Sequence, residues 1–302
     1  MTLKTITIDT YKTPMATALS ASYLTVYPHR PGMAASLDAH LRAILHLEGY
    51  VWVILANGKP VGMASVAPLP GLPGMFELDG FIAPQWQRQG LGSQLLRRVM
   101  DELPGTAVHQ ISHAVTDIHS PAAQFLQHHH FAISNEEWLL VKQDLADCEP
   151  PAHPDLTWGT LSRVQAVAKF CELYDRSFKS LPWYQPYTTH EVAAELTAAR
   201  DLLFLRRGAE FIGFAWLRWP EKTVGQIEPI GIVAGEQRKG YGRYLLAAAL
   251  HQFAQRGAKR AQIGAWATNQ TAIRLYESMG FRHQETVTYL AYDLPVSIVN
   301  RK

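Results

Sequence analysis

A short stretch in the second half of the chain decides the fold: Gln237-Arg238-Lys239-Gly240-Tyr241-Gly242. An apolar run over residues 227–234 precedes it and has the length of one buried strand. After it, apolar side chains recur with helical spacing from Leu245 to Phe253. The sequence therefore predicts a strand, a glycine-containing loop and a helix in direct succession.

This succession favours binding of an anion at the start of the predicted helix. The first N–H groups of a helix have no partner within it, and they lie at the positive end of the helix dipole. Gly240 and Gly242 let an anion approach the backbone without a Cβ in the way. Arg238, Lys239 and Arg243 add positive charge around the same turn. The loop is therefore predicted to bind phosphate.

Two widespread phosphate-binding loops do not match this one. The nucleoside triphosphate loop requires Gly-Lys followed by Ser or Thr, whereas Gly242 is followed by Arg243 and Tyr244. The dinucleotide fingerprint requires a third glycine three residues after the second, where this chain has Leu245. Both nucleotide classes are therefore disfavoured.

A Gln/Arg-x-x-Gly-x-Gly/Ala loop between a strand and a helix resembles the pyrophosphate loop of the GCN5-related N-acetyltransferase (GNAT) family. A second stretch carries the same resemblance, because Asn269 begins a predicted helix, Tyr276 follows two turns later, and Gly280-Phe281 lead into the next strand. The resemblance implies acetyl-coenzyme A as cofactor. It also implies the following coenzyme-binding residues: Ile232, Val233, Gln237, Arg238, Lys239, Gly240, Tyr241, Gly242, Arg243 and Asn269.

The resemblance also implies catalytic roles. Tyr276 would donate a proton to the leaving thiolate, and a backbone N–H of Ile232 or Val233 would stabilise the oxyanion. Glu228 lies in an otherwise apolar strand and would accept the amine proton, since burial would raise its pKa toward the range of a base. The alternatives are that Tyr276 is a core aromatic and that Glu228 is a solvated or substrate-binding carboxylate.

The chain carries the glycine loop twice. At 150 positions before Gly240 and Gly242 lie Gly90 and Gly92. They belong to a second candidate coenzyme-binding stretch, Gln87-Arg88-Gln89-Gly90-Leu91-Gly92. A period this long indicates two domains rather than a solenoid. We therefore expect an N-terminal unit at 1–146, a proline-rich linker at 147–156 and a C-terminal unit at 157–302.

The predicted fold class is α/β, with two tandem GNAT units, each a mixed, mostly antiparallel sheet flanked by helices. The two units are not equivalent in their chemistry. Tyr276 corresponds to Leu126 and Asn269 to His119. Because leucine cannot donate a proton, we expect the first unit to be degenerate and the second to be catalytic. Glu77 in the first unit could be a carboxylate of similar purpose to Glu228, but its register differs by one.

Composition limits the classes of function. A length of 302 residues with 47% hydrophobic residues supports two cores, and a net charge of +2 gives no support for a nucleic-acid binder. The sequence has no apolar run of about 20 residues and no signal-peptide pattern, which predicts a cytoplasmic protein without a membrane partner. Cys148 and Cys171 form no disulfide framework and no metal-ligand spacing.

The resemblance to the GNAT family therefore implies an acetyl-CoA-dependent N-acetyltransferase that transfers acetyl directly to a small-molecule amine. The alternative is a non-catalytic coenzyme A-binding or regulatory tandem protein. Several histidines lie between residues 109 and 130, but no carboxylate or cysteine pattern completes a metal site there, so none is predicted. The following aromatics line an acceptor pocket or serve as packing: Trp183, Tyr184, Tyr187, Trp216 and Trp219.

Overall fold

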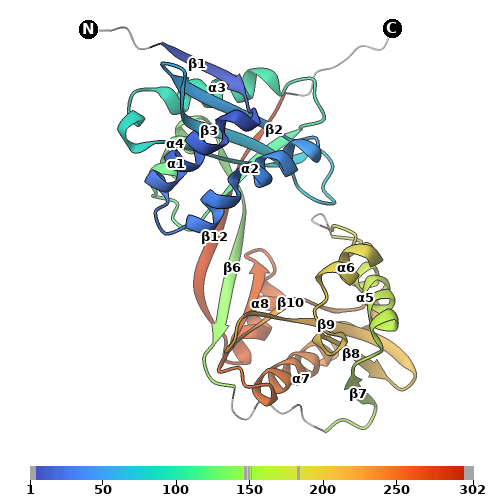
Figure 1. Ribbon diagram of the computed structural model, residues 1–302. Helices are drawn as coiled ribbons and strands as arrows, with labels where there is room; N and C mark the ends of the chain where they lie inside the picture. Colours follow the sequence, from blue (N-terminus) through green and yellow to red (C-terminus); the bar gives the residue numbers. More distant parts are fainter. Residues whose placement is uncertain (1–4, 146–147, 149, 151, 182–183, 296–302) are drawn as a thin grey trace, which may run out of the picture. The chain divides into compact units, whose positions relative to one another are not determined.

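The computed structural model describes residues 5–145, 148, 150, 152–181 and 184–295 (Figure 1). Trp183 and part of the predicted linker lie outside the described residues. The chain divides into two compact units, one formed by Met1–Ser134 with Tyr289–Lys302 and the other by Asn135–Thr288. Each unit is a mostly antiparallel sheet flanked by helices, so the predicted fold class is confirmed.

The first unit contains strands in the order β1-β2-β3-β4-β5-β12. Its elements are β1 (Ile6–Thr10), α1 (Ala16–Val26), α2 (Pro31–His46), β2 (Tyr50–Ala56), β3 (Lys59–Pro68), β4 (Met75–Ile82), α3 (Leu91–Glu102), β5 (Gln110–Val115), α4 (Pro121–His128) and the end of β12 (Arg282–Asp293). The pairs from β1 to β4 are antiparallel, and β4 with β5 is parallel.

Alternate residues of β2 pack into two separate cores, as strand geometry requires. Val51 and Val53 pack with α1 and α2 on one face of the sheet. Trp52 and Ile54 pack with α3 and α4 on the other face. The sheet of the first unit is therefore covered by helices on both faces, which explains why its central strands are apolar on both sides.

The second unit repeats this arrangement, with strands in the order β6-β11-β10-β9-β8-β7. Its elements are β6 (Ala132–Lys142), β7 (Leu156–Gly159), α5 (Arg163–Phe178), α6 (Thr189–Glu195), β8 (Leu202–Arg207), β9 (Glu210–Glu221), β10 (Val224–Ile232), α7 (Tyr241–Gln255), β11 (Arg260–Trp266), α8 (Gln270–Ser278) and the start of β12. Among the strand pairs described for this unit, β10 with β11 is parallel and the others are antiparallel.

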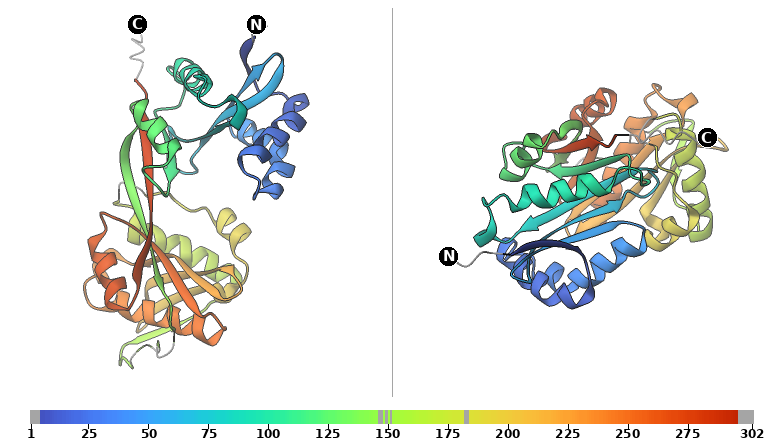
Figure 2. Two further views of the ribbon diagram at one scale, coloured as in Figure 1. Left: turned by 90° about the vertical axis from the view of Figure 1, so that its left-hand side faces the viewer. Right: turned by 90° about the horizontal axis from the view of Figure 1, so that it is seen from above.

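Each unit is completed by a strand segment from the other half of the chain. Residues 137–142 of β6 pair with β11 in the second unit. The last part of β12 belongs to the first unit, where Leu290 is buried in the core and Asp293 accepts a 2.7 Å hydrogen bond from Gln110. Figures 1 and 2 show β6 and β12 running alongside each other. The sequence repeat was predicted to divide at the linker, residues 147–156. The compact units divide instead within β6, after Ser134, and within β12, before Tyr289.

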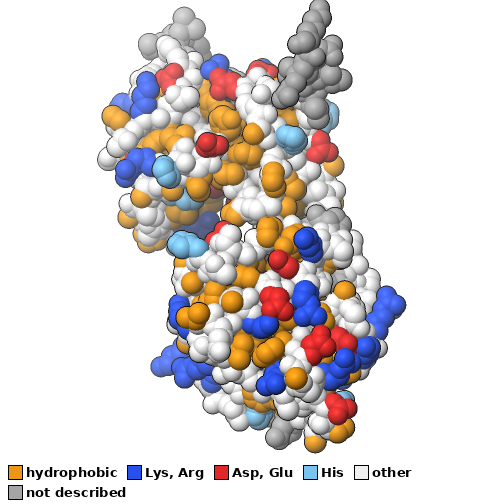
Figure 3. Space-filling view, turned by 90° about the vertical axis from the view of Figure 1, so that its right-hand side faces the viewer, with side chains coloured by type: hydrophobic (Ala, Val, Ile, Leu, Met, Phe, Trp, Pro, Cys, Tyr) orange, Lys and Arg blue, Asp and Glu red, His pale blue; other side chains and the backbone are white. Residues whose placement is uncertain are grey.

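Charged side chains are mixed in sign on the face shown in Figure 3. Lysine and arginine alternate there with aspartate and glutamate rather than forming a continuous basic stripe. This pattern agrees with a formal net charge of +2. That face therefore lacks the kind of surface that tracks a phosphate backbone.

Phe253 on α7 is the side chain whose removal should destabilise the second unit most clearly. It is fully buried, and its ring lies 5.2 Å from that of Trp219. We expect Phe253→Ala to lower the free energy of unfolding by about 3–5 kcal/mol, because it removes apolar contacts and leaves a cavity. Urea unfolding measures this, with the exposed Val164→Ala on α5 as control. A loss below about 1 kcal/mol would contradict this assignment of the core.

Candidate functional site

The second unit contains a gap between its two parallel strands. β10 pairs with β11 only from Val224 to Ile227. Beyond that point β11 remains paired with β6 as far as Trp266, and β10 remains paired with β9 as far as Ile232. Residues 228–232 of β10 therefore face residues 264–266 of β11 across an unpaired space, which we call the fork.

The pairing of β10 with β9 determines which backbone groups face the fork. Val233 donates its N–H to the carbonyl of Ile212 at 3.0 Å, so the pair Ile232 and Gly213 is a non-hydrogen-bonded pair of the ladder. The N–H groups of Ile232 and, two residues earlier, Ile230 therefore point away from β9. Of the two oxyanion donors predicted from the sequence, Ile232 has an N–H on the fork side, whereas the Val233 N–H already has a partner.

The sequence did not indicate Ile230. The ladder shifts register between Ile227 and Ile230, which is a bulge, and Pro229 within it has no N–H to offer. Pro229 was the one visible signal that the strand is interrupted. Without the register, the sequence could not show which N–H groups remain unpaired.

The glycine loop, residues 237–243, has the geometry of an anion cradle. Gly240 is the N-cap of α7 with φ of +85°, a left-handed conformation that glycine adopts without cost. Gln237 secures the loop by donating to the carbonyl of Ile232 at 2.9 Å. The N–H groups at 241–243 have no acceptor among the described residues. They therefore remain available to a negatively charged ligand.

The cationic side chains around the loop differ in their partners. Lys239 pairs with Glu236 at 3.1 Å, and Arg243 donates to Ser278 on α8 at 2.6 Å. Arg238 has no ion-pair partner among the described residues. Arg243 therefore ties the loop to α8, and Arg238 is the cation left for a phosphate.

The α8 helix begins at Asn269, which serves as its cap. The Asn269 side chain accepts a hydrogen bond from the N–H of Ala272 at 3.2 Å. Further along, α8 packs against the glycine loop, since a Cβ on Gly242 would lie 3.4 Å from Leu275. The predicted coenzyme-binding residues on the loop and on α8 are therefore brought together in one unit.

Tyr276 follows Leu275 on α8 and is 7% exposed. Its hydroxyl has no hydrogen-bond partner among the described residues, although buried phenols usually find one. Burial raises the pKa of this phenol above its usual value. Tyr276 is therefore a protonated donor without an acceptor. Its burial also agrees with the alternative of a core aromatic, because its ring packs 6.1 Å from that of Phe281.

Glu228 differs from the sequence-based expectation. The expected burial is wrong, because the side chain is exposed at the bulge of β10. Its carboxylate accepts a hydrogen bond from Gln226, whose own side-chain carbonyl accepts from Gln262 at 3.3 Å. The carboxylate is therefore oriented by a glutamine pair, and its environment is solvent rather than a dry core.

Arg218 on β9 links the bulge to the helices beside it. It donates to the backbone carbonyl of Glu228 at 3.1 Å and to Glu195 on α6 at 2.9 Å. Its guanidinium also lies 4.2 Å from the centre of the Trp216 ring. Of the predicted wall aromatics, Tyr187 packs near Trp216 at 6.3 Å, whereas Trp219 packs against Phe253 in the core. Nothing in the sequence indicated Arg218, because its contacts come from distant segments.

The first unit has the same loop but a different fork. Gly90 has φ of +78°, and Gln87 donates to the carbonyl of Ile82 at 2.7 Å, as in the second unit. However, β4 and β5 stop pairing after Glu77, and there the ring of His113 bonds the carbonyl of Leu78 at 2.8 Å across the opening. The first unit therefore has its fork bridged by a side chain.

The partners of α4 in the first unit also differ from those of α8. Ser120 caps the helix by accepting from the N–H of Ala123 at 3.2 Å, and His119 plays no part in that cap. Leu126 stands buried at the place of Tyr276. The first unit thus has the same glycine loop without the phenol that α8 carries.

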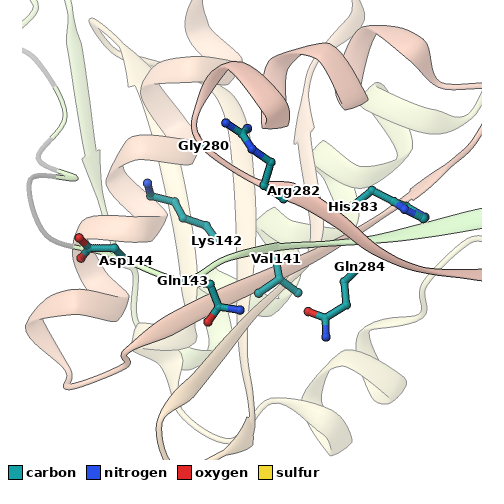
Figure 4. Close-up of a pocket in the computed structure, with 8 residues that line it drawn as sticks. All are labelled: Val141, Lys142, Gln143, Asp144, Gly280, Arg282, His283 and Gln284. Atoms are coloured by element: carbon teal, nitrogen blue, oxygen red, sulfur yellow. The ribbon is translucent and has the colours of Figure 1, made fainter.

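One hollow of the second unit lies away from the fork. It has a volume of about 470 Å³ and lies between the end of β6 and the start of β12, as Figure 4 shows. Its residue Lys142 pairs with Ala261 at the beginning of β11, whereas the fork opens after Ile263. This hollow is therefore separate from the strand segments that form the fork.

No group of three or more His, Cys, Asp or Glu side chains within the described residues is arranged to hold a metal ion. None of the helices within these residues has both the length and the apolarity to cross a bilayer.

Comparison with known protein families shows to which family the chain belongs. The model of the acetyltransferase (GNAT) family matches residues 15–131 and again 167–281. The chain belongs to the GNAT family. It does so in tandem form, with one match in each half, which confirms the predicted duplication.

Curated relatives of this GNAT protein include mycothiol acetyltransferases. That of Thermomonospora curvata is 29% identical over 243 residues, covering 78% of this chain and 80% of the relative. That of Nocardioides sp. is 24% identical over 248 residues, covering 72% and 80%. That of Corynebacterium glutamicum strain R is 28% identical over 138 residues, so the chain spans about half (47%) of that relative's length.

Solved structures share the tandem GNAT fold. A GCN5-related N-acetyltransferase from Sphaerobacter thermophilus aligns with a TM-score of 0.65 at 16% identity, covering 97% of both chains. A tandem GNAT protein from the clavulanic acid biosynthesis pathway aligns with a TM-score of 0.66 at 14% identity, covering 97% of this chain and 100% of the other. At these identities the similarity concerns the fold.

Proposed function

We propose that the second unit transfers an acetyl group from acetyl-coenzyme A directly to the amino group of a small molecule. The observation that carries this proposal is the fork. A strand edge at 228–232 is left unpaired beside a helix start whose N–H groups at 241–243 have no acceptor. Unpaired backbone groups need a ligand or water as partner. A thioester carrier with amide groups and a diphosphate offers its amides to the strand edge and its diphosphate to the helix start.

The residues present fit coenzyme A. The N–H groups at 241–243 and the Arg238 side chain would hold the diphosphate, and the β10 edge would pair with the amides of its pantetheine arm. When bound, the coenzyme supplies the activated thioester. The mycothiol acetyltransferase relatives support acetyl as the transferred group by their names.

Three groups of the chain would act on the reacting atoms. The N–H groups of Ile230 and Ile232 would stabilise the carbonyl oxygen as negative charge develops on it. Tyr276 would donate its proton to the departing sulfur. Glu228 would accept the proton of the attacking amine, directly or through water, because it is exposed next to the same segment.

The acceptor side favours a positively charged small amine. Glu228 and Glu195 present two carboxylates, and Arg218 bridges the Glu195 carboxylate to the Glu228 backbone. Tyr187 supplies an aromatic ring near both carboxylates, whereas Trp216 is buried and its ring lies under the Arg218 guanidinium. Carboxylates and aromatic rings together attract ammonium groups. A cationic small-molecule amine is therefore the acceptor class that these side chains suit best.

Glu228→Gln provides a test of the proton acceptor. We expect kcat/KM for acetyl transfer to fall by about 10²-fold at neutral pH, because the amide keeps the shape of the side chain but cannot take a proton. Glu221→Gln, which changes an exposed carboxylate on β9, is the matched control. An unchanged kcat with a raised KM would instead make Glu228 a substrate-binding carboxylate.

The proposed function is tested by thiol release from acetyl-coenzyme A with a panel of small amines. Turnover with at least one amine, and product mass increased by one acetyl group, is the expected result. Tight coenzyme binding without turnover on any amine would favour the non-catalytic alternative, for which the bridged fork of the first unit gives a structural precedent.

A further inference from the structure

The hollow between the end of β6 and the start of β12 is lined mainly by hydrogen-bond donors (Figure 4). Its volume of about 470 Å³ is within the range of about 300–1,000 Å³ that small-molecule sites occupy. Neither the fork nor the glycine loop contributes a residue to it. The polar lining consists of two cations, an imidazole, two amides and a carboxylate: Lys142, Arg282, His283, Gln143, Gln284 and Asp144.

Lys142 brings a positive charge into this hollow without a partner. The side chain is partly buried, and its ammonium has no hydrogen bond or ion pair among the described residues. A Cβ on Gly280 would lie 3.0 Å from Lys142 Nζ, so the ammonium lies directly beside that glycine. An ammonium carries three donors, and withdrawing it from water without an acceptor is unfavourable. An anion in the hollow would supply the missing acceptor.

Arg282 reaches the same place from β12. Its Nη1 donates to the carbonyl of Phe281 at 3.0 Å and to that of Glu277 at 3.4 Å, near the C-terminal end of α8. The negative end of the helix dipole therefore accounts for one cation here, but Lys142 donates to none of these carbonyls. The Nε and Nη2 groups of Arg282 have no acceptor in the part of the chain that the structure describes. In Figure 4 both side chains extend toward Gly280.

These two cations are specific to the second copy of the repeat. The residue 150 positions after Lys142 is Tyr292, whose ring lies 5.6 Å from that of Phe131 and packs against the core of the first unit. The residue 150 positions before Arg282 is Ala132. The first unit forms the same strands and helix without either cation. The fold therefore does not require them, which leaves binding of a ligand as their role.

We infer that this hollow binds the phosphate group of a small phosphate monoester, held beside Gly280 between the Lys142 ammonium and the Arg282 guanidinium. A phosphate monoester offers three terminal oxygens, enough for the Nε and Nη2 pair of Arg282 and for Lys142 together. A carboxylate has two oxygens, and the arginine alone would engage both. The lining keeps a positive charge, because these cations outnumber its one carboxylate, Asp144. The inference does not depend on the transfer reaction proposed above.

The experiment uses the full chain, labelled with ²H and ¹⁵N and titrated with glycerol 3-phosphate, with and without coenzyme A. The backbone amide signals of residues 142–144 and 282–284 report on the hollow, and those of residues 241–243 report on the glycine loop. Neutral glycerol and anionic acetate are the matched probes. We expect saturable shifts of the first group with glycerol 3-phosphate, binding of acetate weaker by about tenfold or more, and no shifts with glycerol. Coenzyme A should leave the hollow free.

Two variants locate the binding. Lys142→Tyr copies the residue of the first unit and should abolish the shifts, and Lys142→Met removes the charge and should weaken binding by about tenfold or more. Lys179→Met, which changes an exposed lysine at the end of α5, should leave binding unchanged. If Lys142→Tyr fails to fold, Lys142→Met still decides.

Four results would each overturn the inference. They are the absence of saturable shifts in the natural protein, equal binding of acetate, unchanged binding in Lys142→Met, and loss of the glycerol 3-phosphate shifts once coenzyme A is bound. The last result would assign the hollow to the coenzyme itself.

Discussion

Replacing Tyr276 by phenylalanine should lower kcat for acetyl transfer by about 10²–10³-fold while leaving coenzyme affinity nearly unchanged. The change removes one oxygen that has no protein partner among the described residues, so the fold loses no hydrogen bond given by the structure. What is lost is the proton for the departing sulfur. Steady-state kinetics together with equilibrium binding of coenzyme A separate these two effects.

The pH dependence adds a check on Tyr276. Because burial raises the pKa of its phenol above the usual value of about 10, the proton stays in place at neutral and mildly alkaline pH. The wild-type rate should therefore show no loss from this group below about pH 10. Tyr244→Phe, which removes a hydroxyl 3.4 Å from the Leu156 carbonyl, is the control. A kcat within threefold of wild type for Tyr276→Phe would remove it from the mechanism.

Replacing Gly240 by valine should weaken coenzyme binding by about 10²-fold or more. No atom lies within 4 Å of a Cβ at this position, so the new side chain meets no clash in the free protein. The effect comes from φ of +85°, which a β-branched residue rarely adopts, and from a side chain placed where the diphosphate would approach. Movement of the loop would also turn the N–H groups at 241–243 away from the ligand. Calorimetric titration with coenzyme A measures the loss.

Gly90→Val is the matched control for this prediction. Gly90 has φ of +78° and likewise no atom within 4 Å of its Cβ position, so the strain introduced is of the same kind. We expect a comparable loss of stability in the first unit but little change in kcat or in the affinity that supports turnover. An equal loss of turnover in both variants would contradict the assignment of catalysis to the second unit alone.

The sequence predicted those parts of the site that depend on local structure. The glycine loops were predicted to open directly into a helix, and Gly90 and Gly240 stand at the N-caps of α3 and α7. Asn269 specifies a helix cap, which it forms. These features depend on a few neighbouring residues, so spacing alone is sufficient to find them.

The sequence could not predict what depends on pairing between distant segments. Alternation in β6 and β12 shows that they are strands, but not that each completes the other half's sheet. The burial predicted for Glu228 was wrong because the apolar run suggested a fully enclosed strand, whereas a bulge leaves the carboxylate in solvent. The sequence also could not predict the hydrogen bond between the His113 ring and the Leu78 carbonyl, because this contact depends on where β4 and β5 stop pairing.

The two units therefore differ around their glycine loops. The second has an unpaired fork between β10 and β11 and a buried phenol, Tyr276, without a hydrogen-bond partner among the described residues. The first keeps the glycine loop and has its fork bridged by His113. Duplication has preserved the sheet and the loop while the side chains around them have changed.

The most direct measurement is a crystal structure of the protein with coenzyme A bound. The diphosphate is predicted to accept hydrogen bonds from the N–H groups at 241–243, and the sulfur to lie within about 3.5 Å of the Tyr276 hydroxyl, between β10 and β11. A coenzyme held only by the loop at Gly90, or one whose sulfur lies far from Tyr276, would contradict the account.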